Sequence, residues 1–240
     1  MPTAGVAPYN LVALVNKSMT MTDSDGAAMV NALNAVLPTF CSDWAIPLVR
    51  VNYVKRNIPT NLALQCHVLD NTSGPLNNEV SKDVPYAKVA VKSILDSSGV
   101  MLYSDNPAVP TVAARVSHEI FELLADLRSN GWWSSADANT LYAAEVCGPV
   151  ESNVVKIESK GFPVVGLCDW VLPAWSDANA KVGPFNHNKT LKAPLTVEKT
   201  GSVITLKNGV VTKVFGENAS AFTRANLCLQ CVKRNVKLVA

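Results

Sequence analysis

The stretch Ser117-His118-Glu119-Ile120-Phe121-Glu122-Leu123-Leu124-Ala125-Asp126 forms the centre of the most strongly helical segment of the sequence, residues 111–127. In an α-helix, positions four residues apart lie one above the other on the same face. His118 and Glu122 are therefore predicted neighbours, and Glu119 lies about 100° further round the helix. The segment determines both the expected fold and the expected chemistry, because it is a core helix that carries an H-E-x-x-E pattern.

This pattern is typical of a metal-binding helix. Helices with an H-E-x-x-H pattern present two zinc ligands four residues apart, and here Glu122 stands in place of the second histidine. A zinc site needs a third ligand from elsewhere, and Glu145 is our candidate. Further carboxylates follow at Glu151 and Asp169, whereas His67 and His187 are weaker candidates.

The remaining polar residues near the pattern have expected catalytic roles. Glu119 is placed to act on water as a general base without binding the metal. Tyr142 is our candidate for stabilising an oxyanion. The competing interpretation is structural, because H-E-x-x-E is short and common, and a His–Glu pair on an amphipathic helix is most often a solvated face.

Composition limits the class of protein. The chain has 240 residues, of which 48% are hydrophobic and 17% charged, so it has enough apolar residues for a full core and is not disordered throughout. The formal charge of +2 predicts no nucleic-acid partner. No apolar run is long enough to span a membrane. Only three histidines are present, so a metal site must also use carboxylates or cysteines.

The six cysteines are too few for a disulfide scaffold, and we interpret most of them as small buried hydrophobic residues in a reducing compartment. Cys228 and Cys231 have the spacing of a metal-ligand pair, but no second such pair completes four ligands. The N-terminus lacks the basic and apolar regions of a secretion signal, so we expect the protein in the cytoplasm or in a virion.

Alternating apolar residues and turn signals predict an α+β fold. We expect a helix after residue 22 that ends at Pro38, a loop over residues 71–82, irregular chain over 131–153, and a type I′ hairpin at Asn208-Gly209. Expected strands cover residues 11–15, 48–54, 61–69, 86–91 (at an edge), 154–157, 164–172, 202–207 and 210–215. The predicted domains are residues 1–190 and a C-terminal hairpin extension, residues 191–240.

Three segments together resemble a largely uncharacterised zincin-like family of bacteria and tailed bacteriophages. Members carry an S-H-E-x-x-E-x-x-x-D-P helix, a Y-x-x-E-x-C-D segment and an S-D-F-V-x-P-x-W segment. In this chain the corresponding stretches are residues 117–127, 142–148 and 168–175. The resemblance covers roughly residues 9–176. Flanking positions differ, with Leu127, Gly148 and Trp170 in place of the family's residues.

The resemblance implies a zincin-like mixed sheet with an active-site helix, zinc bound by His118, Glu122 and Glu145, and Glu119 as the base. It implies a zinc metallopeptidase acting on a peptide or protein substrate. The alternative is a catalytically inactive structural component of a tailed-phage virion (capsid, neck or tail) that associates with itself or with other virion proteins. A third hypothesis is a cytosolic binding module with a structural metal.

Overall fold

The first sheet of the protein contains five strands. The computed structural model describes residues 10–55, 63–71, 79–81, 84–218 and 237–238. The strands are β1 (Leu11–Asn16), β2 (Arg50–Val54), β3 (Leu64–Leu69), β4 (Glu79–Ser81) and β5 (Val84–Ala90), in the order β2-β1-β3-β5-β4. Neighbours in β2-β1-β3-β5 run parallel, and β4 is an antiparallel edge strand.

Two expectations for this region were wrong. The loop expected over residues 71–82 contains β4, and the strand expected at residues 86–91 is not at an edge, because β5 lies between β3 and β4. The short polar strand β4 has no alternating apolar pattern, so periodicity gave no signal for it.

The long helix α1 (Asp23–Asp43) begins where the sequence predicts. Thr22 and Asp25 form a reciprocal capping box at its start. The predicted end at Pro38 was wrong, because the helix continues through Pro38 for more than another turn. Leu37, Phe40 and Cys41 are buried around that point, and their burial offsets the hydrogen bond that proline cannot donate.

The central helix α3 (Val112–Ala125) confirms the strongest expectation. The Thr111 side chain caps it by accepting the Ala114 N–H at 3.0 Å. The helix ends two residues before the expected limit, where Asp126 leaves the helical conformation and accepts the N–H of Gly131 at 2.7 Å. Both α3 and α1 contact the first sheet and each other, and α3 also contacts β9.

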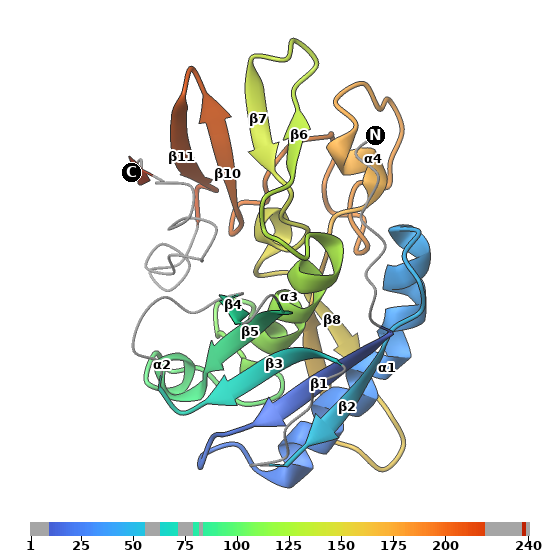
Figure 1. Cartoon of the computed structure of the whole chain (residues 1–240), viewed down its shortest axis with the longest axis vertical. Coiled ribbons are helices and arrows are strands. Elements are labelled where there is room, and N and C mark those ends of the chain that lie inside the picture. The colour runs from blue at the N-terminus through green and yellow to red at the C-terminus, as the bar shows by residue number, and fades with distance from the viewer. Residues whose placement is uncertain (1–9, 56–62, 72–78, 82–83, 219–236, 239–240) are drawn as a thin grey trace.

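The second sheet has the order β12-β11-β10-β7-β6. It contains β6 (Trp132–Ser134), β7 (Thr140–Ala143), β10 (Ser202–Lys207), β11 (Val210–Phe215) and β12 (Lys237–Leu238). Residues 131–153 were expected to be irregular, but they hold β6, β7 and the 3₁₀ helix η1 (Gly148–Val150). Figure 1 shows the two five-stranded sheets at opposite ends of the molecule, with α3 between them.

The hairpin prediction is confirmed. Strands β10 and β11 pair around Asn208 and Gly209, whose φ values of +50° and +74° are those that a type I′ turn requires. Strand β10 also pairs with β7, so the C-terminal hairpin continues a sheet begun by residues before 190.

A third, two-stranded sheet pairs β8 (Val154–Ile157) with β9 (Val165–Cys168). Short helices α2 (Val91–Leu95) and α4 (Pro173–Ser176) complete the described elements. One large apolar core joins α1, α3, the first sheet and the segment around Trp170 and Trp175. The protein is therefore mixed α and β with several sheets, in agreement with the expected α+β class. Among the described residues, no helix has the length and apolarity to cross a membrane.

Candidate metal centre

His118 lies at the centre of the candidate site, in the middle of α3. Its side chain is 12% exposed. The Nδ1 atom lies 3.9 Å from the Sγ of Cys168, and the Nε2 atom lies 3.9 Å from the Oε1 of Glu122. The two ring nitrogens therefore face two different kinds of donor, a thiol and a carboxylate.

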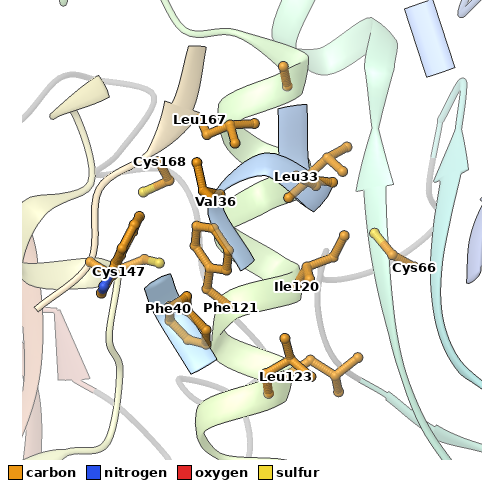
Figure 2. Packing of buried hydrophobic residues seen from close by; sticks show 14 of the residues in the cluster. Leu33, Val36, Phe40, Cys66, Ile120, Phe121, Leu123, Cys147, Leu167 and Cys168 are labelled. Atoms are coloured by element: carbon orange, nitrogen blue, oxygen red, sulfur yellow. The ribbon is translucent and has the colours of Figure 1, made fainter. Parts of the chain in front are cut away.

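The thiol side forms a compact group. His118, Cys147 and Cys168 each offer one ligand atom, and these atoms all lie within 4.8 Å of one another. Figure 2 shows Cys147 and Cys168 on one side of α3 and Cys66 on the other. Zinc–sulfur bonds of about 2.3 Å and zinc–nitrogen bonds of about 2.0–2.1 Å place tetrahedral S and N ligands about 3.6 Å apart. The donor set and its spacing therefore fit a metal ion.

Two side chains of α3 hold the backbone of both cysteines. The Oγ of Ser117 accepts the N–H of Cys168 at 2.7 Å. The Oε1 of Glu122 accepts the N–H of Cys147 at 2.7 Å, and its Oε2 accepts the N–H of Val146 at 3.1 Å. Residues on either side of His118 thus fix both cysteine segments against the helix.

Burial changes the protonation of this group. Desolvation raises the pKa of the Cys147 thiol well above its ordinary value, and a hydrogen bond with the Cys168 thiol raises it further. Desolvation lowers the pKa of His118 well below its ordinary value, helped by the charges of Arg115 and Lys213. The imidazole is consequently neutral at physiological pH, which is the form that binds metals.

The carboxylate side consists of Glu122 and Glu145, both buried. Desolvation raises the pKa of Glu122 well above its ordinary value, and the charge of Glu145 raises it further, while the two backbone N–H groups lower it. The predicted ligands Glu122 and Glu145 are therefore close enough to interact. Glu145 is not a member of the compact group around Cys147 and Cys168.

The predicted base Glu119 lies in a buried ion-pair network. Its Oε1 is 2.6 Å from a guanidinium nitrogen of Arg115, and both side chains are less than a tenth exposed. The same guanidinium contacts the Oε1 of Glu151 at 3.3 Å. Burial raises the pKa of Glu119, and the charge of Arg115 opposes that rise.

Gly148 fits closely into its surroundings. A Cβ atom on Gly148 would lie 3.0 Å from the carbonyl oxygen of Ser202 and 3.2 Å from the Oε2 of Glu145. Such contacts are closer than ordinary van der Waals separations. The C-terminal hairpin and the Glu145 carboxylate thus occupy the space that a side chain at position 148 would need.

The other residues singled out from the sequence lie in distinct surroundings. Tyr142 and Trp175 pack in a T-shaped arrangement, with ring centroids 6.5 Å apart. His187 stacks on Trp170 with centroids 4.0 Å apart, and the Nδ1 of His67 lies 3.2 Å from the Lys17 ammonium.

Asp169 is buried, and the amide of Asn186 donates to it at 2.6 Å. Cys228 and Cys231 lie outside the described residues.

A pocket of about 260 Å³ opens beside the site. Its lining includes His118, Arg115 and Glu151 together with the apolar residues of the segment 107–110 and Val154. His118 is thus the member of the compact group through which a bound molecule would approach a metal.

Sequence reasoning singled out His118 and missed its two nearest thiols. Cys147 and Cys168 are 21 positions apart in sequence, each without a cysteine partner nearby. The available signal was the scarcity of histidine, which favours cysteine as a co-ligand. No protein-family model, no curated protein and no solved structure matches this chain.

Proposed function

We propose that this chain is a zinc-dependent hydrolase of the metallopeptidase kind, with a zincin-like fold and zinc bound at His118. The observation that carries the proposal is the position of His118, which lies on the H-E-x-x-E helix with a thiol 3.9 Å from one ring nitrogen and a carboxylate 3.9 Å from the other. The mixed sheet followed by α3 supports the zincin-like part of the proposal, because the resemblance implies a mixed sheet with an active-site helix.

Each residue of the pattern has a proposed role. Zinc supplies Lewis-acid activation of water and of a carbonyl group. His118 binds the metal, and Glu122 and Glu145 are the ligands that the resemblance assigns beside it. Glu119 accepts and returns protons once its contact with Arg115 opens. Tyr142 remains the proposed donor to the oxyanion.

The pocket beside His118 supports a peptide or protein substrate. Its apolar segment 107–110 suits a hydrophobic side chain, and the Arg115 and Glu151 charges in the same lining suit the polar backbone of a peptide.

Hydrolysis of casein by the zinc-loaded protein tests this function. We expect cleavage that 1,10-phenanthroline stops and that Glu119→Gln abolishes. The matched control is Glu158→Gln, because Glu158 is an exposed carboxylate paired with Lys156. Equal cleavage by wild type and Glu119→Gln would contradict the assignment of the base.

A second candidate function is that of an inactive zincin-like component of a tailed-phage virion. The specific observation in its favour is the 2.6 Å contact between Arg115 and Glu119, which occupies the base in a buried ion pair. In this case the protein self-associates or binds other virion proteins. Quantitative mass spectrometry of purified particles tests it, and we expect a fixed copy number. Absence from the particles would contradict it.

A further inference from the structure

We propose that the metal is bound by the thiolates of Cys147 and Cys168 and by the Nδ1 of His118, and that Glu122 orients His118 instead of binding the metal. This inference rests on the metal-binding part of the proposed function and is independent of hydrolysis. It replaces the two carboxylate ligands that the resemblance implies with two sulfur ligands, and it defines a site for a thiophilic divalent ion such as Zn²⁺.

The first argument is the spacing of the donor atoms. The Nδ1 of His118 is 3.9 Å from the Sγ of Cys168, and the three ligand atoms of His118, Cys147 and Cys168 lie within 4.8 Å of one another. Tetrahedral zinc ligands of these types lie about 3.6–3.8 Å apart. The His118–Cys168 pair therefore has to contract by a few tenths of an ångström, and the pairs that include Cys147 by at most about 1.2 Å, to bind an ion.

The second argument is the position of Glu122. Its Oε1 accepts the N–H of Cys147 at 2.7 Å and lies 3.9 Å from the Nε2 of His118, on the side of the ring away from Cys168. Histidines that bind metals commonly donate their other ring N–H to a carboxylate, which fixes the ring orientation. Metal binding at Nδ1 leaves a proton on Nε2, and Glu122 is the carboxylate that a movement of less than about 1 Å brings within hydrogen-bond distance of it.

The third argument is that α3 fixes the thiols before a metal arrives. Glu122 holds the backbone of Cys147, and Ser117 holds the backbone of Cys168 at 2.7 Å. Cys147, Cys168 and Glu122 are all nearly or fully buried, so water does not compete for these contacts. Soft sulfur ligands select zinc over magnesium or calcium, which prefer oxygen.

Cobalt(II) substitution of the reduced, metal-free full chain tests the ligand set directly. Thiolate ligands give cobalt intense charge-transfer absorption in the near ultraviolet, whereas carboxylate and imidazole ligands do not. We expect this absorption to saturate at one cobalt per chain in the wild type. Cobalt binding without it, or no cobalt binding, would overturn the inference.

Substitutions then assign the sulfur atoms. Cys147→Ala and Cys168→Ala should each remove or strongly reduce the absorption, while Cys66→Ala, a buried cysteine on the opposite side of α3, should leave it unchanged. Cys168→Ser, which preserves side-chain volume, is the second variant, and circular dichroism in chelator establishes that each variant is folded. Absorption that survives in folded variants lacking either thiol would overturn the assignment.

Glu122→Gln separates orientation from ligation. A carboxylate that orients a metal-bound histidine typically contributes 10–100-fold to metal affinity. We therefore expect cobalt affinity to fall in that range while the thiolate absorption persists, and unchanged affinity would overturn the role of Glu122. Because all these spectra are recorded without substrate, a chain that binds cobalt through sulfur and does not cleave casein would contradict the proposed hydrolase and leave this inference intact.

Discussion

The Oε1 of Glu122 accepts the backbone N–H of Cys147 at 2.7 Å, joining the central helix to the loop that follows β7. The same oxygen lies 3.9 Å from the Nε2 of His118. One carboxylate of α3 therefore faces both the candidate metal-binding histidine and the segment of Cys147. The candidate metal centre is therefore built into the packing of α3 and is not an addition to the surface of the protein.

Ser117→Ala should loosen the attachment of β9 to α3. The substitution removes the acceptor of the Cys168 N–H, which is buried, and leaving a buried donor unsatisfied costs about 1–3 kcal/mol. Urea unfolding of the metal-free protein should show a loss of that size. Ser176→Ala is the control, because the Ser176 hydroxyl makes an exposed local hydrogen bond to the Pro173 carbonyl within α4. Equal stability of the two variants would contradict the role of Ser117.

Arg115→Met should strongly destabilise the protein. It leaves the buried carboxylate of Glu119 and the partly buried carboxylate of Glu151 without the guanidinium that contacts them, and breaking a buried ion pair from one side costs about 3–5 kcal/mol. Lys55→Met is the matched control. The Lys55 ammonium lies 3.0 Å from the Asp23 carboxylate, but both side chains are more than half exposed. We therefore expect Lys55→Met to lower the free energy of unfolding by less than about 1 kcal/mol.

The pH dependence of the metal-free protein should depend on Glu122. Because burial raises its folded pKa above the ordinary value of 4.5, its protonated form stabilises the folded state. That contribution is complete below pH 4.5 and is lost as the pH rises through the raised folded pKa. Wild type in chelator should thus lose more stability between about pH 5 and about pH 8 than Glu122→Gln does.

Urea midpoints at both pH values provide the measurement. All other titrating groups are common to both proteins, so the difference between the two slopes reports on Glu122 together with its charge interaction with Glu145. A wild-type slope equal to or smaller than that of Glu122→Gln would show that the carboxylate is not held protonated by its surroundings.

Periodicity predicted the elements whose signal is local. The apolar spacing that predicts α3 lies within one short segment, and so does the Asn208-Gly209 pair that predicts the hairpin turn. Both predicted elements are present in the structure. The predicted helix end at Pro38 was wrong because it followed from a local rule alone. Tertiary packing buries residues of α1 beyond Pro38, and the sequence pattern does not show that burial. Strand β4 was missed because its pairing with β5, and not its own pattern, makes it a strand.

The site was predictable to the extent that it lies on one helix. Positions 118, 119 and 122 follow from helical geometry, which gives the contact between His118 and Glu122. The thiols come from separate segments, which meet because Val171 donates its N–H to the carbonyl of Val146 at 2.7 Å. The Arg115 contact of Glu119 lies on the same helix, four residues earlier, so helical spacing also predicts this pair.

Zinc content of the purified, reduced protein tests the central claim most directly. Elemental analysis of wild type, His118→Ala and His67→Ala, each equilibrated with zinc and freed of excess, gives the comparison. His67 is the control because its side chain contacts Lys17 and Gln65 and is not a member of the group formed by His118, Cys147 and Cys168. We predict one zinc per chain in wild type and His67→Ala, and loss of zinc in His118→Ala. Zinc-free wild-type protein, or equal zinc in all three, would contradict the account.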